Sequence, residues 1–342
     1  MNISVGIVGL PNVGKSTLFK ALTKKQVDIA NYPFCTIEPN IGIVKVPDER
    51  LEKLAQLFHP QKTIPAIVEF VDIAGLVKGA HEGEGLGNQF LSHIREVQAI
   101  CHVVRCFEDS DIVHVQEGID PVRDIDIIHT ELLLKDLETV RKRIEKERGP
   151  YDILDQLQNA LDKGMFASQF VEKNPEAADI AGELQLLTSK PLFYVCNSHT
   201  QNLPKALEEL FAREKRLYTI MNLKEELDIE ELGKEASEEL KLKPKLPELV
   251  HTAYKLLDLI TFFTAGADEV RAWTIRKGDK APDAGGAIHS DFKEKFIRAA
   301  IIHWDKLIEA GGVAEAMAKG WLRTEGKEYV VRDGDVIEIK HG

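Results

Sequence analysis

The sequence contains few cysteines and no long apolar run. Its 342 residues include four cysteines, none of which forms a C-x-x-C pair. We therefore expect reduced thiols, and neither a disulfide framework nor a cysteine-based metal site. The absence of 18 consecutive apolar residues argues against a transmembrane helix. Because the N-terminus enters a predicted strand at once, we also expect no signal peptide.

The sequence also lacks an excess of positive charge. Its formal net charge of −12 argues against a protein that coats nucleic acid broadly. Residues 259–342 hold 13 Lys and Arg against 14 Asp and Glu, so the negative charge is concentrated in residues 1–258. A local contact with RNA or a ribosome therefore remains open for the C-terminal part. The length is sufficient for two or three domains.

A glycine-rich stretch near the N-terminus carries the strongest chemical signal. The segment Gly9-Leu-Pro-Asn-Val-Gly-Lys-Ser-Thr17 fits the phosphate-loop pattern G-x-x-x-x-G-K-[ST]. It lies between an apolar run that predicts a buried strand and a segment that predicts a helix, so its backbone N–H groups would face an anion at the helix N-terminus. Lys15 would contact the β- and γ-phosphates, and the Ser16 hydroxyl would bind magnesium. The predicted phosphate-binding residues are Asn12, Val13, Gly14, Lys15, Ser16 and Thr17.

Two later segments complete the predicted phosphate and magnesium site. Thr36 lies in a loop between two prolines, where a nucleotide switch places a threonine that closes on magnesium and the γ-phosphate. Residues 67–75 predict a strand that ends in Asp-x-x-Gly. Asp72 would support magnesium and Gly75 would donate its N–H group to the γ-phosphate. The predicted metal ligands are Ser16, Thr36 and Asp72.

The usual water-orienting glutamine after the Asp-x-x-Gly glycine is missing, because this position holds Leu76. Hydrolysis therefore needs another group, or is slow until a partner supplies one. His114 follows a predicted central strand, residues 99–107, at the edge of the sheet where ligands collect. A catalytic role and an ordinary loop hydrogen bond fit His114 equally well from the sequence alone. His102, inside that strand, is expected to pack in the core.

Residues 127–187 predict a helical insertion. Leu133, Leu137, Val140 and Ile144 follow steps of four, three and four, which is typical of a helical seam. The strand pattern returns at residues 192–197, so the nucleotide-binding domain is predicted to comprise residues 1–126 and 188–258.

The motif Asn-Lys-x-Asp, which reads guanine, is absent from the chain. The strand at residues 192–197 ends instead in Asn197, Ser198, His199 and Thr200. Because an asparagine amide can pair with the N6 donor and N7 acceptor of adenine, Asn197 and Ser198 are the predicted base contacts. The sequence therefore favours ATP over GTP.

Residues 259–342 predict a compact α+β module. Strand patterns occur at residues 261–266 and 269–274, and Asp333-Gly334 between alternating apolar residues predicts a β-hairpin.

Several of these segments together resemble the Obg-like ATPases of the YchF family. The similarity covers nearly the whole chain, although Thr200 stands where the family usually has glutamate and His81 where it usually has a small polar residue. The matching segments are 9–17, Asn31-Tyr-Pro-Phe-Cys-Thr-Ile-Glu-Pro39, Asp72-Ile-Ala-Gly-Leu-Val-Lys-Gly79, 82–88, 102–107, 262–266, 269–274, Ile288-His289 and Asp291-Phe292.

The resemblance implies a mostly parallel α/β P-loop domain, a helical coiled-coil insertion at residues 127–187 and a β-grasp (TGS) domain at residues 259–342. It further implies ATP preference, a cytoplasmic location and association with ribosomes, and it places the family's candidate catalytic histidine on His114. RNA contact through the C-terminal domain and a monomeric state are further expectations.

The sequence therefore predicts a slow ATPase that uses Mg2+ and acts as a ribosome-associated switch. The alternative is a nucleotide-dependent ribosome or RNA adaptor with negligible hydrolysis. Leu76 favours this alternative, whereas the set Lys15, Ser16, Thr36 and Asp72 favours the ATPase.

Overall fold

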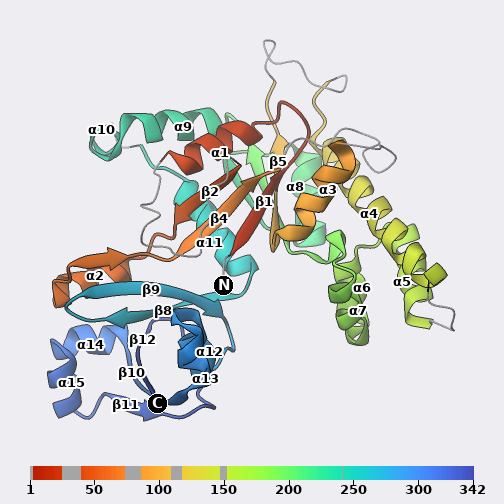
Figure 1. Ribbon diagram of the computed structural model, residues 1–342. Coiled ribbons are helices and arrows are strands. Elements are labelled where there is room, and N and C mark those ends of the chain that lie inside the picture. The colour runs from red at the N-terminus through yellow and green to blue at the C-terminus, as the bar shows by residue number, and fades with distance from the viewer. Residues whose placement is uncertain (1–2, 25–39, 74–85, 109–117, 147–151, 241) are drawn as a thin grey trace.

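The protein contains two β-sheets and a separate helical region (Figure 1). The computed structural model describes residues 3–24, 40–73, 86–108, 118–146, 152–240 and 242–342. The N-terminal sheet lies among helices on both sides, the helical region extends from one flank, and the C-terminal sheet lies below (Figure 1). The predicted α/β fold with a C-terminal α+β domain is confirmed.

The N-terminal sheet has the order β2-β4-β1-β5-β6-β7, in which only β2 runs antiparallel to its neighbour. All seven residues of β5 are buried, because a central parallel strand is covered on both faces. The carboxyl ends of β1, β4, β5 and β6 therefore meet at one edge. The elements of this domain are β1 (Ser4–Val8), α1 (Lys15–Thr23), β2 (Ile41–Lys45), β4 (Ile67–Asp72), α3 (Leu86–Glu96), β5 (Ala99–Arg105), β6 (Leu192–Asn197), α8 (Lys205–Glu214), β7 (Tyr218–Met221), α9 (Leu223–Leu232), α10 (Lys234–Glu239) and α11 (Leu246–Leu256).

One long helix joins the helical region to the first domain. The N-terminal half of α4 contributes Ile125, Ile128 and Leu132 to the main core, whereas Leu137 and Val140 belong to a second core made by the following helices. The predicted seam therefore faces a core of its own. The elements are α4 (Pro121–Lys146), α5 (Asp152–Asp162), α6 (Ala167–Lys173), the 3-10 helix η2 (Pro175–Ala177), α7 (Ala178–Glu183) and the 3-10 helix η3 (Leu187–Ser189).

The C-terminal sheet has the order β11-β10-β12-β8-β9-β3. Its last strand, β3, comes from the segment between β2 and β4 of the first domain. Sequence patterns did not predict this placement of β3 in the C-terminal sheet. The elements of this part are α2 (Glu49–Phe58), β3 (Lys62–Ile64), β8 (Leu259–Ala265), β9 (Glu269–Arg276), α12 (Ala281–Ile288), α13 (Ser290–Glu294), β10 (Phe296–His303), α14 (Trp304–Ala310), α15 (Val313–Ala318), β11 (Arg323–Glu325) and β12 (Asp335–His341).

The predicted β-hairpin at Asp333-Gly334 is wrong. The turn forms, with Gly334 at a φ of 89°, but β12 pairs with β10 and β8 rather than with the residues before the turn. Val330 instead forms an isolated bridge with Lys280. The residues before the turn and those after it therefore pair with different parts of the chain, because tertiary pairing overrides the local hairpin signal.

Among the described residues, no helix combines the length and the apolar character that crossing a membrane requires.

Candidate functional site: the phosphate loop and its surroundings

The loop between β1 and α1 adopts a conformation that depends on two glycines. Gly14 directly precedes α1 and has a φ of 110°, in the region that side chains disfavour. A Cβ at Gly14 would lie 2.7 Å from the Asn197 Nδ2 atom, and one at Gly9 would lie 2.5 Å from the Val103 carbonyl oxygen. The loop is therefore packed against β5 and β6 and cannot accept larger residues at these points.

The Lys15 side chain lies within this loop. It is 9% exposed, and its ammonium group donates a hydrogen bond of 2.8 Å to the Leu10 carbonyl oxygen. Burial lowers the pKa of Lys15, whereas the negative charge of Asp72 opposes that shift. The structure thus places one buried cation beside the N-terminus of α1, where the helix dipole already favours an anion.

Asp72 ends β4 and pairs in register with Ile7 of β1, one residue before the end of that strand. Burial raises the pKa of Asp72, whereas the charge of Lys15 lowers it. The carboxylate of Asp72 and the hydroxyl of the exposed Ser16 are hard oxygen donors, which suit Mg2+. Only two of the three predicted metal ligands lie in the described part of the chain, which contains no group of three or more His, Cys, Asp or Glu side chains able to hold a metal.

Asn197 connects the phosphate loop to the strands beside it. Its Nδ2 atom donates to the Val13 carbonyl oxygen at 2.9 Å, and its Oδ1 atom accepts from the Leu223 N–H group at 3.2 Å. The side chain is 6% exposed. The predicted base contact therefore also positions the loop, a role that the sequence alone did not reveal.

The residues after Asn197 form a tight turn at the same edge of the sheet. The buried Ser198 donates its backbone N–H group to Met221, and its hydroxyl oxygen accepts from the Thr200 N–H group at 3.2 Å. His199 stacks on Phe107, with ring centroids 4.2 Å apart. This pair joins the carboxyl ends of β5 and β6 beside the predicted base contacts.

His102 packs in the core, as predicted. It is 1% exposed and lies opposite Val8, the last residue of β1. Its ring lies near Tyr194, whose hydroxyl forms a 2.9 Å hydrogen bond with His129 of α4. Burial keeps the pKa of His102 well below its usual value, and electrostatic interactions with His129 and Lys15 lower it further.

Several predicted site residues lie outside the described residues. These are Thr36, Gly75 and His114, and the neighbouring Leu76 and His81 also lie outside the described ranges. The described members Asn12, Val13, Gly14, Lys15, Ser16 and Thr17 all belong to the loop or to the first turn of α1. Asn12 has a φ of 64° in the loop.

Two residues of the site have no signature in the sequence. Leu10 offers the carbonyl oxygen that holds Lys15, and Leu223 packs so closely that its Cδ1 atom would lie 2.9 Å from a Cβ at Gly14. Both contributions depend on backbone position or shape, so their residue type gives no signal.

Two protein families match separate parts of the chain. The family described as "50S ribosome-binding GTPase" matches residues 4–143. The YchF-GTPase C-terminal family, described as a protein of unknown function (DUF933), matches residues 259–342. The two matches correspond to the loop-bearing part of the chain and to the C-terminal domain.

Curated relatives match from end to end. The ribosome-binding ATPase YchF of Bacillus subtilis is 49% identical, and that of Escherichia coli is 46% identical, each over 99% of both chains. A solved structure, the YchF GTPase of Schizosaccharomyces pombe, superimposes with a TM-score of 0.81 at 39% identity, over 99% of this chain and 98% of that chain. This protein belongs to the YchF family of P-loop proteins.

Proposed function

We propose that this protein binds ATP at the phosphate loop and hydrolyses it slowly, as a switch that associates with the ribosome in the cytoplasm. The observation that carries the proposal is the buried Lys15 ammonium, held 2.8 Å from the Leu10 carbonyl oxygen at the N-terminus of α1. The relatives named ribosome-binding ATPase supply the choice of nucleotide and of partner.

The loop would bind the phosphate chain through its backbone N–H groups and through Lys15. When phosphate oxygens enter, the ammonium exchanges the Leu10 carbonyl for a charged acceptor, which forms a stronger hydrogen bond. Because the loop is already folded, little reorganisation opposes binding or the stabilisation of charge that develops on the phosphate.

Ser16, Thr36 and Asp72 would hold Mg2+. The bound ion would neutralise charge on the phosphate oxygens. The Asp72 carboxylate is partly buried, and it lies close enough to Lys15 for each charge to affect the pKa of the other.

A water molecule must be oriented towards the γ-phosphorus, and Leu76 has no polar atom for this task. We propose that His114 positions the water. Because loss of a positioned acid or base commonly costs about 10²–10⁴-fold in rate, His114→Ala should lower turnover strongly while ATP affinity stays near wild type. Leu76→Ala should change turnover much less.

Asn197 and Ser198 would contact the base, with ATP preferred over GTP. Both polar atoms of the Asn197 amide already hold the loop and α9, so they contribute limited further hydrogen bonding to a base. A modest preference for ATP is therefore expected. Equilibrium titration with both nucleotides measures it, and a clear preference for GTP would refute the assignment.

The central experiment compares wild type with Lys15→Ala in single-turnover hydrolysis of magnesium-ATP, with and without ribosomes. We expect Lys15→Ala to abolish hydrolysis and weaken binding sharply. Lys20→Ala, which removes an exposed lysine from the same helix, serves as the matched control and should behave as wild type. Normal turnover in folded Lys15→Ala would refute the proposal.

A second candidate is a nucleotide-dependent ribosome or RNA adaptor without significant hydrolysis. Leu76 in place of glutamine favours it. In the same experiment, this candidate predicts no hydrolysis, even when ribosomes are present.

A further inference from the structure

The segment between β2 and β4 leaves the first domain and joins the second sheet. Residues 46–66 contain α2 and β3, and β3 pairs in parallel with β9. The Gln61 N–H group donates to the Ala267 carbonyl at 3.2 Å, and the Lys62 N–H group donates to the Asp268 carbonyl at 3.1 Å. We call residues 46–66 the crossover segment.

Helix α2 of the crossover segment packs on the C-terminal domain. The Arg50 guanidinium lies 5.3 Å from the centre of the Phe263 ring of β8, and the Lys53 ammonium lies 5.2 Å from that of Trp304 at the start of α14. Leu51 and Leu54 of α2 are buried in the same core as Phe263. The helix therefore packs on the C-terminal domain within a core that also includes residues of the first sheet.

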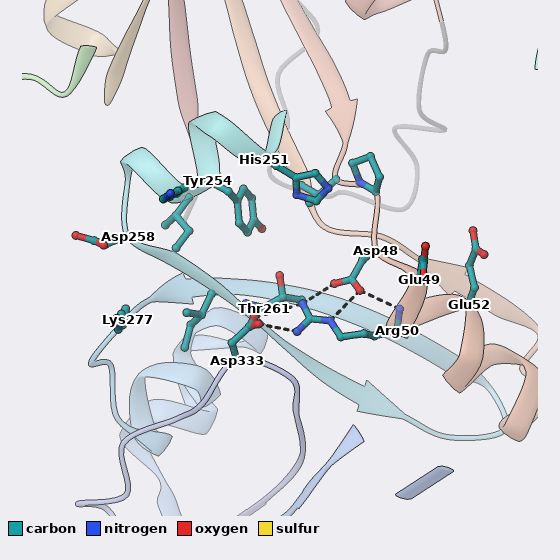
Figure 2. A pocket seen from close by; sticks show the side chains of 15 residues that line it. Asp48, Glu49, Arg50, Glu52, His251, Tyr254, Asp258, Thr261, Lys277 and Asp333 are labelled. Carbon is teal, nitrogen blue, oxygen red and sulfur yellow. Dashed lines mark hydrogen bonds and ion pairs between the residues drawn. The ribbon is translucent and has the colours of Figure 1, made fainter. Parts of the chain in front are cut away.

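Arg50 links the start of the crossover segment to the C-terminal domain through charge (Figure 2). Its Nε atom donates to Asp48, the N-cap of α2, at 2.9 Å, and its Nη1 atom donates to Asp333 at 2.6 Å. Asp333 also accepts from the Thr261 N–H group of β8 at 2.9 Å. Arg50 thus joins the beginning of the crossover segment to the turn before β12.

The Arg50–Asp333 ion pair lies near the protein surface. The Asp333 side chain is 52% exposed and that of Arg50 is 23% exposed, so solvent reaches one side of the ion pair and moderates its strength. A cavity of about 830 Å³ lies beside it, lined by side chains from both domains. These include His251 and Tyr254 of α11 and Lys277 after β9 (Figure 2).

The crossover segment continues through β4 to the phosphate site. Pro47 and Pro65 stand at its two ends, where their fixed φ limits bending, and the Val46 N–H group donates to the Ala66 carbonyl at 2.8 Å across its base. From there β4 runs six residues, about 20 Å, to Asp72 beside Lys15.

We propose that the crossover segment couples the orientation of the C-terminal domain to nucleotide binding, with the Arg50–Asp333 ion pair as its latch. The inference rests on the proposed nucleotide binding. A nucleotide that fixes Lys15 and Asp72 restricts the motion of β4. It thereby also restricts the crossover segment and its contact with the C-terminal domain. Because coupling between two sites is reciprocal, weakening the latch must also weaken nucleotide binding.

Hydrogen exchange of the wild-type protein tests the first direction. The reporters are peptides that cover residues 46–66 and 259–265, which include the amides of Lys62 and Thr261. We expect magnesium-ATP to slow their exchange at least about fivefold, since couplings of this kind commonly span about 5–150-fold. A peptide from α5, in the separate helical core, serves as the internal control.

Latch variants test the second direction. Arg50→Ala should weaken magnesium-ATP binding about fivefold and abolish the exchange response, at the low end of typical couplings. Asp333→Asn keeps an acceptor for Thr261 but removes the negative charge, so it should act in the same way and replaces Arg50→Ala if that variant misfolds. Arg141→Ala removes an exposed ion pair in the helical region and should bind ATP within about twofold of wild type.

The outcomes separate the two proposals. Wild type that binds no ATP overturns the proposed function and this inference together. Wild type that binds ATP without any change in the exchange of the reporter peptides overturns only the coupling. The same conclusion follows if folded Arg50→Ala and Asp333→Asn bind ATP as tightly as wild type does.

Discussion

At the scale of single residues, the Asn197 amide and the Gly14 backbone hold the phosphate loop in place. Asn197 bonds both to the loop and to the first residue of α9, and Gly14 leaves the space that this amide occupies. Each position therefore offers a substitution whose effect follows from these contacts.

Asn197→Ala removes a buried donor and a buried acceptor at once. The Val13 carbonyl and the Leu223 N–H group lose their partner, so we expect a loss of about 1–3 kcal/mol in the free energy of unfolding together with weaker ATP binding. Asn222→Ala is the control, because Asn222 caps α9 without contacting the loop. It should cost about 1 kcal/mol and leave ATP affinity unchanged. Urea unfolding and ATP titration measure both effects, and equal ATP affinities for the two variants would contradict the role given to Asn197.

Gly14→Ala places a methyl group where the structure has no room. The φ of 110° is unfavourable for alanine, and the new Cβ would lie 2.7 Å from Asn197. We expect a cost of about 2 kcal/mol or more and loss of nucleotide binding, because strain and overlap add. Gly164→Ala, at a φ of 79° with nothing within 4 Å, isolates the backbone strain and should cost about 1 kcal/mol. Thermal unfolding of the two variants measures these costs. A similar loss of unfolding free energy in both would show that the loop shifts to accept the methyl group.

At the scale of elements, α4 is fixed at its middle by a buried carboxylate. Asp136 is fully buried and accepts hydrogen bonds from the backbone N–H groups of Leu187 and Thr188, at 2.7 and 2.8 Å. The Thr188 hydroxyl donates to it at 2.6 Å and itself accepts from Ala167. One side chain thus ties α4 to η3, where the chain leaves the helical region.

Asp136→Ala should loosen the helical region. Two backbone N–H groups lose their acceptor in a buried place, and each such loss costs about 1–3 kcal/mol. Hydrogen exchange within residues 152–186 should accelerate strongly while exchange in β1 and β5 changes little. Arg141→Ala, which removes an exposed pair with Asp162, should cost no more than about 1 kcal/mol. If hydrogen exchange in residues 152–186 is unchanged in Asp136→Ala, the Asp136 hydrogen bonds do not stabilise the helical region.

At the scale of the whole molecule, buried histidines make stability depend on pH. Burial lowers the pKa of His129 to about 4, with a further contribution from Arg216, and burial also lowers the pKa of His102. The unfolded chain, with ordinary values near 6.5, therefore binds more protons than the folded chain between these pKa values. Stability is fully present above the unfolded pKa and is lost as the pH falls from 6.5 towards 4.

His129 alone should remove about 1–2 kcal/mol of unfolding free energy between pH 7 and pH 5. Urea unfolding at the two pH values measures this loss. His129→Gln, whose amide reaches towards Tyr194 without titrating, should make the dependence shallower. His341→Gln, an exposed position near the C-terminus, should leave it as in wild type. If the unfolding free energy of His129→Gln depends on pH as steeply as that of wild type, His129 does not contribute to the pH dependence.

The sequence by itself determined the features that depend on residue type and local spacing. The phosphate loop, its flanking strand and helix, the buried strand β5 and the helical insertion follow from glycine spacing and from apolar periods, which act over a few residues. The core position of His102 follows for the same reason, since a central parallel strand is buried on both faces.

Only the tertiary structure decided which segments meet. Neither Asn197 holding Val13, nor β3 joining a sheet about 200 residues away in the sequence, nor β12 pairing with β10 and β8 can be read from local pattern. The two strand pairings are fixed by backbone hydrogen bonds between distant segments, which any residue except proline can both donate and accept, and the Asn197 contact depends on β6 ending beside the loop. A short edge strand such as Lys62–Ile64 therefore leaves no signal of its partner in the sequence, and its place is set by the packing of α2 on the C-terminal sheet.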